Sequence, residues 1–213
     1  MGEAARLLGV SRQRLAAWFH GWPGRPQGLF RSDYSALFDK PNISFLDLID
    51  SAVCVTLREK HKVSQKTIRR LYDKLSADWN TPHPFAREEF LTDKSGRVFC
   101  LIASDDDEPK KLIDILSQQF AIPNVLLPYL KRVEYNSTTK FAQVLPLKGK
   151  VVLDPRRKYG KPIVSGTGMP TIILNECYQA TKSFDVVADW YNVMPDDVME
   201  AVKFETEFSG IAA

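Results

Sequence analysis

Short segments with helical apolar spacing, each preceded by a serine, constrain this 213-residue chain to a mainly helical fold. Ser11 precedes RQRLAAWF, Ser44 opens the S-x-x-D pattern of a capping box, and Ser64 and Ser183 precede two further segments of this kind. A serine hydroxyl at such a position accepts one of the backbone N–H groups that a helix start leaves without a partner. We therefore expect helices that begin at these four serines.

The first two expected helices are separated by a glycine. Residues 2–8 (GEAARLL) predict a short helix that Gly9 can end in the left-handed conformation, and Ser11 can cap the next helix. Helix, glycine turn and capped helix is the pattern of a helix-turn-helix, although an ordinary helical corner has it too. The loop that follows, GWPGRPQGLFR (21–31), has the place and composition of a wing.

Two longer helices are expected next. The segments after Ser44 and Ser64 both carry apolar stripes at helical spacing. The stripes consist of Phe45, Leu48, Ile49, Ala52, Val53 and Leu57, and of Ile68, Leu71, Tyr72 and Leu75. The other face of the second helix is basic and is expected to be solvated, and it carries Lys66, Arg69, Arg70 and Lys74. Thr81-Pro-His-Pro84 then breaks the helical pattern and is a candidate hinge.

The middle of the chain predicts short strands and helices. EEFLT and RVFCLIA flank Asp93-Lys-Ser-Gly96, which is the pattern of a hairpin with a glycine turn. The acidic run at 105–108 lacks the spacing of a calcium loop, so it favours the start of a helix at 109–119. A second short helix at 123–132 and short strands within 132–153 follow.

The segment YGKPIVSGTGMPT (159–171) raises the question of a phosphate site. A Walker loop has its Gly-Lys pair at the end, whereas Gly160-Lys161 comes first here and Pro162 removes a backbone donor. Thr171 stands where a dinucleotide fingerprint has its third glycine. We therefore expect a strand, a glycine turn and a helix that has Pro170 in its first turn. No acid–base or nucleophile set is evident in the sequence, so an enzyme is not expected.

The C-terminal segment predicts three short helices joined by three- to four-residue turns, again a helix-turn-helix-like pattern. Ser183 caps the second helix, and Pro195-Asp-Asp197 starts the third with acids in its first turn. The third helix carries, against Lys203, the acids Asp196, Asp197, Glu200, Glu205 and Glu207. DNA carries one negative charge per about 1.7 Å of axis and would be repelled, so we expect this bundle to bind protein.

The net charge of +3 is unevenly distributed. Residues 11–31 contain four arginines and no acid, whereas residues 169–213 contain eight acids and two lysines. This asymmetry indicates two surfaces for two partners, one of them anionic, with uneven solvated faces as the alternative.

Other features limit the class of protein. No run of 18 apolar residues could span a membrane, and the start MGEAARLLG lacks the build of a signal peptide. Cys54, Cys100 and Cys177 are odd in number and far apart, which fits reduced thiols in the cytoplasm. No Cys/His pair has zinc-ligand spacing, so we expect no metal site and no cofactor.

Two parts of the chain resemble known families. DPRRKYGKPIVSGTGMPT through YQATKSFDVVADWYNVMPDDVMEAVKFE (154–205) resembles a family catalogued as a domain of unknown function. Its members are small bacterial and archaeal helix-turn-helix-like proteins, often antitoxins. GEAARLLGVSRQRLAAW and ISFLDLIDSAVCVTLREKHKVSQKTIRRLYDKL resemble the helices of MerR-type winged helix-turn-helix domains, although Met1 abuts the first helix here. The combination resembles a class of VapB-type antitoxins, weakly from about 85 to 150.

The resemblance implies a fold that is mainly α with small β hairpins. It implies a MerR-like winged helix-turn-helix that binds DNA (1–80), a connecting region of hairpin and helix (81–150), and a C-terminal three-helix, helix-turn-helix-like antitoxin domain that binds protein (151–213). By resemblance, such proteins neutralise a PIN-domain (VapC-like) ribonuclease toxin and repress their shared operon. The expected partners are operator DNA, this toxin and a second copy of the chain in a homodimer.

The expected DNA contacts lie at the start of the chain. Base edges are read from the N-terminal end of a recognition helix, and arginines in a wing contact phosphates. The predicted DNA-binding residues are Ser11, Arg12, Gln13, Arg14, Trp18, Arg25 and Arg31. Arg156 and Arg157 are candidates for an acidic toxin site, although surface arginines are common.

An alternative function is a stand-alone MerR-like transcription regulator with a ligand-sensing middle region. Aromatic side chains there could line a pocket or form core, and they are Phe85, Phe90, Phe99 and Phe120.

Overall fold

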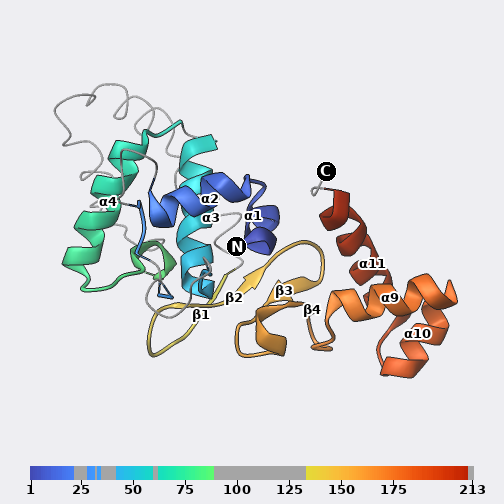
Figure 1. Ribbon diagram of the computed structural model, residues 1–213. Helices are drawn as coiled ribbons and strands as arrows, with labels where there is room; N and C mark the ends of the chain where they lie inside the picture. The colour runs from blue at the N-terminus through green and yellow to red at the C-terminus, as the bar shows by residue number, and fades with distance from the viewer. Residues whose placement is uncertain (22–27, 32, 35–41, 60–61, 89–132, 211–213) are drawn as a thin grey trace, which may run out of the picture. The chain divides into compact units, whose positions relative to one another are not determined.

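The computed structural model describes residues 1–21, 28–31, 33–34, 42–59, 62–88 and 133–210 (Figure 1). The chain divides into two compact units, Met1–Ala142 (unit 1) and Gln143–Ala213 (unit 2). The described residues are mainly helical with one small sheet, as predicted. The hairpin and the two helices predicted between residues 88 and 132 lie outside the described residues, so the three-domain division stays a prediction.

Unit 1 begins with the predicted pair of helices, α1 (Gly2–Leu8) and α2 (Arg12–His20). Gly9 ends α1 with a φ of 64°, in the left-handed region that glycine adopts without a steric cost. Ser11 Oγ accepts the backbone N–H of Arg14 at 3.2 Å and caps α2. The helix, glycine turn and capped helix predicted from the sequence are therefore present.

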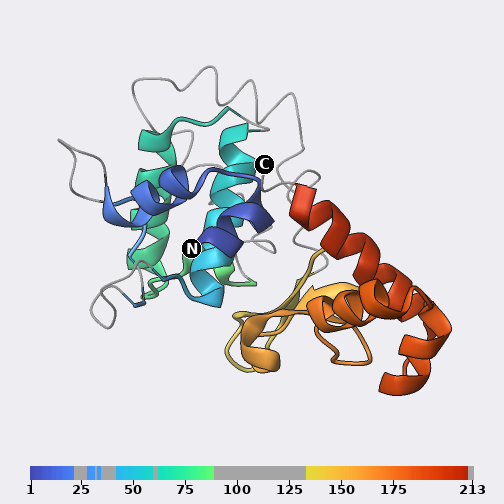
Figure 2. The same ribbon diagram turned by 45° about the vertical axis from the view of Figure 1, so that its right-hand side comes forward.

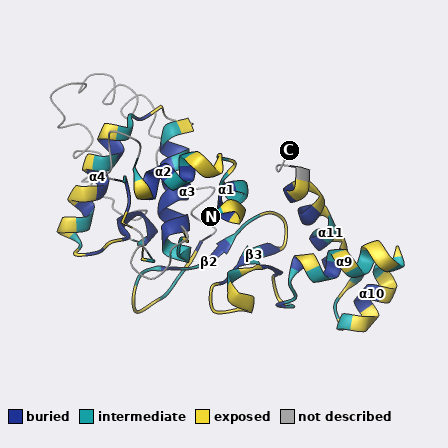
Figure 3. Ribbon diagram, viewed as in Figure 1, coloured by how far each residue is buried: buried dark blue, intermediate teal, exposed yellow. Residues whose placement is uncertain are grey.

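The helix α3 (Phe45–Glu59) packs against α1, α4 and η1 and is buried along most of its length (Figure 3). Its predicted capping box forms, because the Ser44 N–H donates to Asp47 Oδ2 at 2.8 Å and the Asp47 N–H donates to Ser44 Oγ at 3.0 Å. The predicted apolar stripe is buried except for Phe45, which is half-buried.

The helix α4 (Gln65–Asp78) begins at its predicted cap, where Ser64 Oγ accepts the Thr67 N–H at 3.1 Å. Its four predicted apolar residues are buried. Its basic face is exposed apart from Arg69, which is half-buried.

α4 ends at Asp78, so the predicted break in the helical pattern is confirmed, while a hinge stays a prediction for the buried segment after α4. This segment folds back onto α3 and α4 as the 3-10 helix η1 (Pro84–Ala86), and Phe85 is fully buried. The Tyr72 hydroxyl donates to the carbonyl of Pro82, and the Tyr72 and Phe85 rings meet edge-on at 5.6 Å. These contacts hold the segment in the core of unit 1.

The small sheet has the strand order β1-β2-β3-β4. Its strands are β1 (Glu134–Tyr135), β2 (Ala142–Pro146), β3 (Val151–Leu153) and β4 (Pro162–Val164). β2 and β3 pair antiparallel with Leu145 opposite Leu153, and β3 and β4 pair antiparallel with Val152 opposite Ile163. The strands predicted within 132–153 and before the glycine turn are confirmed.

The glycine-rich segment forms the predicted strand, turn and helix start. Gly166 and Gly168 have φ angles of 82° and 68°, which favour glycine. The Gly168 N–H donates to the Val164 carbonyl at 3.0 Å, and the Met169 N–H donates to Thr167 Oγ1 at 3.0 Å. These backbone donors are therefore engaged within the turn itself, as the structural interpretation requires.

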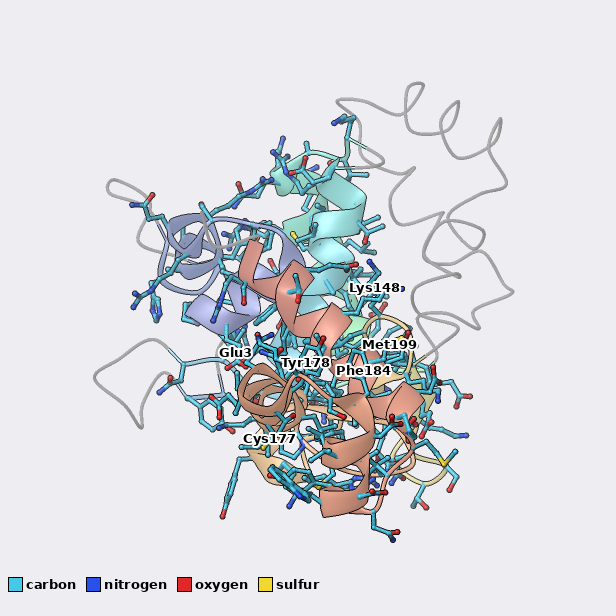
Figure 4. The ribbon with its side chains drawn as sticks, turned by 90° about the vertical axis from the view of Figure 1, so that its right-hand side faces the viewer. Glu3, Lys148, Cys177, Tyr178, Phe184 and Met199 are labelled. Atoms are coloured by element: carbon cyan, nitrogen blue, oxygen red, sulfur yellow. The ribbon has the colours of Figure 1, made fainter. Side chains whose placement is uncertain are left out.

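Three helices complete unit 2, namely α9 (Thr171–Thr181), α10 (Phe184–Tyr191) and α11 (Pro195–Gly210). α11 packs against both α9 and α10 (Figure 2). The core between them consists of Val164, Leu174, Val187, Ala188, Val198 and Ala201. The rings of Tyr178 and Phe184 stack at 4.3 Å and join α9 to α10 (Figure 4).

Two details of the predicted bundle were wrong. The turn between α9 and α10 has two residues and is shorter than predicted, because Lys182 adopts a left-handed φ angle of 56° directly after α9, whereas the turn between α10 and α11 has three residues, as predicted. The third helix is not short, since α11 spans 16 residues. Its sequence contains no glycine or proline between Pro195 and Gly210 that would end it earlier.

No helix in the part of the chain described here is long and apolar enough to cross a membrane. Cys54 and Cys177 are free thiols, and Cys100 lies outside the described residues. Burial raises the pKa of the Cys54 thiol to about 12, so this cysteine is an unreactive core residue.

Candidate functional site

The N-terminal end of α2 presents polar side chains to solvent. Ser11, Arg12 and Gln13 are exposed, whereas Leu15 is fully buried and fixes the helix to unit 1. The first turn of α2 contains no acidic residue. The partial positive charge of the helix start and the Arg12 guanidinium therefore act in the same direction, which suits an anionic partner.

Arg14 is held by two neighbours. Its Nη2 lies 2.6 Å from Glu59 Oε1 at the end of α3, and its guanidinium carbon lies 5.6 Å from the centre of the Trp18 ring. The hydrogen bond and charge of Arg14 lower the pKa of Glu59 below its usual range. Arg14 is thus oriented within unit 1 before any ligand is bound.

Trp18 is a core residue. Its side chain is 3% exposed, and its ring meets Phe30 edge-on at a centroid distance of 6.2 Å. The Phe30 N–H also donates to the Trp18 carbonyl at 2.9 Å. The ring is therefore buried in unit 1 with the Arg14 guanidinium beside it, and a contact between Trp18 and DNA stays a prediction.

The predicted wing is described in part. Arg25 lies outside the described residues, whereas Arg31 is described and exposed. Gly28 approaches α2 closely, because a Cβ at this position would lie 2.3 Å from the Phe19 carbonyl oxygen. The chain therefore returns to the end of α2 immediately before the buried Leu29, and this fixes where Arg31 emerges.

A cluster of carboxylates around His83 was not predicted. His83 Nδ1 lies 2.9 Å from Asp50 Oδ2 and 3.9 Å from Asp47 Oδ1, and His83 Nε2 lies 2.9 Å from Asp33 Oδ1. The side chains of Asp47, Asp50 and His83 are almost fully buried, and that of Asp33 is 36% exposed. We call these four residues the His83 cluster.

In the His83 cluster, burial and the neighbouring charges shift the pKa of each side chain in opposite directions. Burial raises the pKa of Asp50 to about 7, even though the His83 hydrogen bond lowers it. Burial alone would lower the pKa of His83, but its hydrogen bonds to Asp50 and Asp33 and their charges raise it to about 9. Burial also raises the pKa of Asp47. The imidazole is therefore the positive partner that these carboxylates face.

Phe85 is one of the four aromatic residues predicted either to line a pocket or to form core. Phe85 is fully buried in the core, as the core interpretation of the middle aromatics predicts for this residue. Phe90, Phe99 and Phe120 lie outside the described residues.

Unit 2 exposes large apolar side chains on consecutive elements. Trp190 near the end of α10 is 63% exposed, Met194 in the following turn 66%, and Met199 in α11 46%. Val186 is also exposed and lies four residues before Trp190, so the two share one face of α10. Large apolar side chains that are this exposed are candidates for contact with a protein partner.

Most acidic side chains of α11 are paired with other residues of unit 2, so the helix presents less negative charge to solvent than its sequence indicates. Lys150 Nζ lies 2.6 Å from Asp196 and 2.8 Å from Asp197, and Lys148 pairs with Glu207. Glu205 is buried and accepts a hydrogen bond from the hydroxyl of Thr171. Much of the negative charge of α11 is therefore engaged within unit 2.

The two candidate toxin-contacting arginines lie between β3 and β4. Arg156 donates through Nε to Asp154 Oδ1 at 2.9 Å and through Nη2 to Asp154 Oδ2 at 2.8 Å. Arg156 thereby lowers the pKa of Asp154. Arg157 lies over Gly168, where a Cβ would come within 2.0 Å of its Nη2.

The described elements define a mainly helical protein with a small antiparallel sheet, and no protein-family model matches the chain. The chain is 27% identical over 219 residues to the "Putative antitoxin VapB45" of Mycobacterium tuberculosis, and the alignment covers 95% of this chain and 91% of that protein. The crystal structure of Rv2018 from Mycobacterium tuberculosis has a similar fold, with a TM-score of 0.72, 24% sequence identity and coverage of 94% of both chains.

Proposed function

We propose that this protein is the antitoxin of a type II toxin–antitoxin module. It binds and neutralises a PIN-domain ribonuclease toxin of the VapC type and represses its own operon as a homodimer on operator DNA. The observation that carries the proposal is the similarity, along 95% of the chain, to a protein named as an antitoxin. In this function the protein is a binding protein of the cytoplasm and not an enzyme.

The proposed DNA-binding element is the α1–α2 pair, a helix-turn-helix whose second helix enters the major groove. Arg12 and Gln13 read base edges from the exposed start of α2, together with Ser11. Arg14 adds a guanidinium that Glu59 and Trp18 hold in place. Arg25 and Arg31 contact phosphates on either side and set the register of the protein on the duplex.

The proposed toxin-binding surface is the exposed apolar part of α10 and α11. Trp190 is the central residue, because a large aromatic side chain that becomes buried in an interface contributes most of the affinity in many complexes. Met194 and Met199 are exposed in the same unit and supply flexible apolar contacts.

Co-expression with the adjacent reading frame tests the toxin partner. The full-length chain carries the tag, and a ribonuclease that co-purifies in equal amount and is inactive until released is the expected result. Trp190→Ala should weaken this complex by about 2 kcal/mol or more, which is at least about 30-fold in Kd. Tyr159→Ala is the matched control, since Tyr159 is fully exposed in the same unit but lies on η2 (Lys158–Gly160).

Binding of the upstream DNA at several salt concentrations tests the operator. Arg31→Ala should reduce the slope of log K against log salt by about 1, because one phosphate contact is lost. Arg12→Ala should cost about 1–3 kcal/mol on the operator and much less on unrelated DNA. Lys74→Ala removes the same charge from the solvated face of α4 and should change neither quantity.

The outcomes separate the two activities. If no toxin co-purifies but the protein binds its upstream DNA, it is a stand-alone regulator. If a toxin co-purifies and Trp190→Ala does not weaken the complex, the toxin binds elsewhere on the chain. If the operator affinity does not respond to Arg12→Ala, α2 is not the recognition helix.

A further inference from the structure

The His83 cluster joins three parts of unit 1 that are distant in sequence. Asp33 follows the predicted wing, Asp47 and Asp50 lie on the first turns of α3, and His83 directly precedes η1. One donor atom each from Asp33, Asp47 and His83 lies within 4.8 Å of the other two. This is the spacing at which three side chains can share one cation.

Asp47 has an oxygen without a hydrogen-bond partner. Its Oδ2 accepts the Ser44 N–H in the capping box, but Oδ1 is buried and accepts none among the described residues. This free oxygen lies on the side of His83, 3.9 Å from Nδ1. A buried carboxylate oxygen without a partner is costly, and an ion at this position would offset that cost.

The charges of the cluster also lack balance. Three carboxylates face one imidazole, which carries at most a single positive charge. Asp47 and Asp50 are 1% exposed and have little water to screen them. A divalent cation would bring the group close to neutrality, whereas further protons would have to be taken up without one.

His83 Nε2, which lies 2.9 Å from Asp33 Oδ1, is the ring nitrogen that a cation would take. Asp50 Oδ1 is fixed by the Phe85 N–H at 3.0 Å, and Asp50 Oδ2 lies 2.9 Å from His83 Nδ1. With Nδ1 donating its proton to Asp50, a cation at Nε2 takes the place of the proton that the positive imidazole shares with Asp33, and that proton is released to solvent. A carboxylate that orients an imidazole in this way is common behind metal-bound histidines.

The distance between Nε2 and Asp33 Oδ1 fits two adjacent ligands. These atoms lie 2.9 Å apart. Metal bonds of about 2.1 Å place neighbouring ligand atoms about 3 Å apart in an octahedral site and about 3.4 Å apart in a tetrahedral one. The partial exposure of Asp33 gives a cation a way in from solvent.

We propose that Asp33, Asp47 and His83 bind one divalent first-row transition metal ion, with Asp50 as the residue that orients His83. One imidazole and two carboxylates form a ligand set that suits Zn²⁺ or Mn²⁺. The ion fastens the Asp33 segment and the segment before η1 to α3. It is a structural site in unit 1, and it is independent of the proposed antitoxin function. It contradicts the expectation from the sequence that the chain holds no metal.

Metal binding by the tag-free, full-length protein tests the proposal. The protein is stripped with EDTA and titrated with Zn²⁺ and, separately, Mn²⁺ by calorimetry. We expect about one ion per chain and a rise in Tm on loading with the ion that binds, because a ligand of the native state stabilises it. Asp33→Ala should weaken binding at least about tenfold and abolish the rise in Tm.

Matched variants separate this site from other binding. Asp78→Ala removes an exposed carboxylate of α4 that pairs with Lys74, and His20→Gln removes an exposed imidazole, so both should bind the ion as the unaltered chain does. Circular dichroism confirms that each variant is folded. If Asp33→Ala does not fold, Co²⁺ loaded into the unaltered protein should shift and broaden the NMR signals of the His83 imidazole. Absence of stoichiometric binding of either ion, equal binding by Asp33→Ala, or an unperturbed His83 signal would overturn the proposal.

Discussion

Replacement of Asp50 by alanine is expected to destabilise metal-free unit 1 far more than replacement of Asp33. Asp50 is fully buried, and both its oxygens are engaged, one with the His83 ring at 2.9 Å and one with the Phe85 N–H at 3.0 Å. Loss of one partner of a buried ion pair costs about 3–5 kcal/mol, because the other partner stays buried without it. Asp33 makes one bond to His83 and is partly solvated, so its loss should cost about 1 kcal/mol or less.

Urea denaturation in the presence of EDTA measures the difference. Trp190 is the tryptophan of unit 2, so a Trp190→Phe background makes the fluorescence of the remaining tryptophans report on unit 1. With a slope of about 2 kcal/mol/M, Asp50→Ala should lower the urea midpoint by about 2 M and Asp33→Ala by about 0.5 M. Asp50→Asn should fall between them, because its amide oxygen can still accept the Phe85 N–H.

Equal midpoints for Asp50→Ala and Asp33→Ala would refute this reasoning. That result would mean that the native state does not depend on a buried Asp50–His83 pair. A loss of more than about 3 kcal/mol for Asp50→Asn would mean that the charge of Asp50, and not its bond to Phe85, carries the effect.

Three further predictions concern stability. Leu174→Ala should cost about 2–5 kcal/mol in the unfolding of unit 2, measured by urea titration, because Leu174 is fully buried in its core. Ser64→Ala should cost about 1 kcal/mol in the unfolding of unit 1, because the first turn of α4 loses its cap. In EDTA, the stability of unit 1 should fall as the pH rises from about 6.5 to about 9, since the folded pKa of His83, near 9, lies above its unfolded value. Asp50, with a folded pKa near 7, acts in the same direction between about pH 4 and 7, and a flat stability profile across both ranges would contradict the charge state assigned to the cluster.

Helix starts are the part of this fold that the sequence predicts best. Ser11, Ser44, Ser64 and Ser183 each accept the N–H three residues further on. Donor and acceptor of such a bond lie within one turn, so a short pattern contains both partners. The same holds for the turn around Gly166 and Gly168. The positive φ angles there favour glycine, and the sequence has glycine at both positions.

Burial and charge pairing are predicted less well, because they depend on contacts between distant segments. The sequence predicts that Trp18 closes the core and also that it touches DNA, and in the structure its ring is buried beside Phe30. The acids of α11 were counted as a free negative surface, whereas Lys150 reaches Asp197 from 47 residues away in the sequence. A count of charges contains no information on such partners.

The His83 cluster shows the limit of motif searches. His83 lies 33 residues from Asp50 and 50 from Asp33, and no spacing rule links these positions. The sequence contains only an indirect sign of this cluster. Asp47 was recognised as a capping residue, and its second oxygen then needed a partner that the capping box does not supply. A histidine between two prolines, immediately after a helix, was interpreted as part of a hinge because neither proline can continue a helix.

The two ends of α3 explain why its charged residues are placed as they are. Asp47 and Asp50 lie in its first turns, where the positive end of the helix dipole favours carboxylates. Glu59 lies at the opposite end, where the dipole disfavours a negative charge, and the guanidinium of Arg14 at 2.6 Å offsets this. Arg14 is therefore needed by α3 as well as by the proposed DNA contact. In the proposed DNA complex, Arg12 and Gln13 are therefore the residues of α2 assigned to sequence recognition, and Arg14 links α2 to the end of α3.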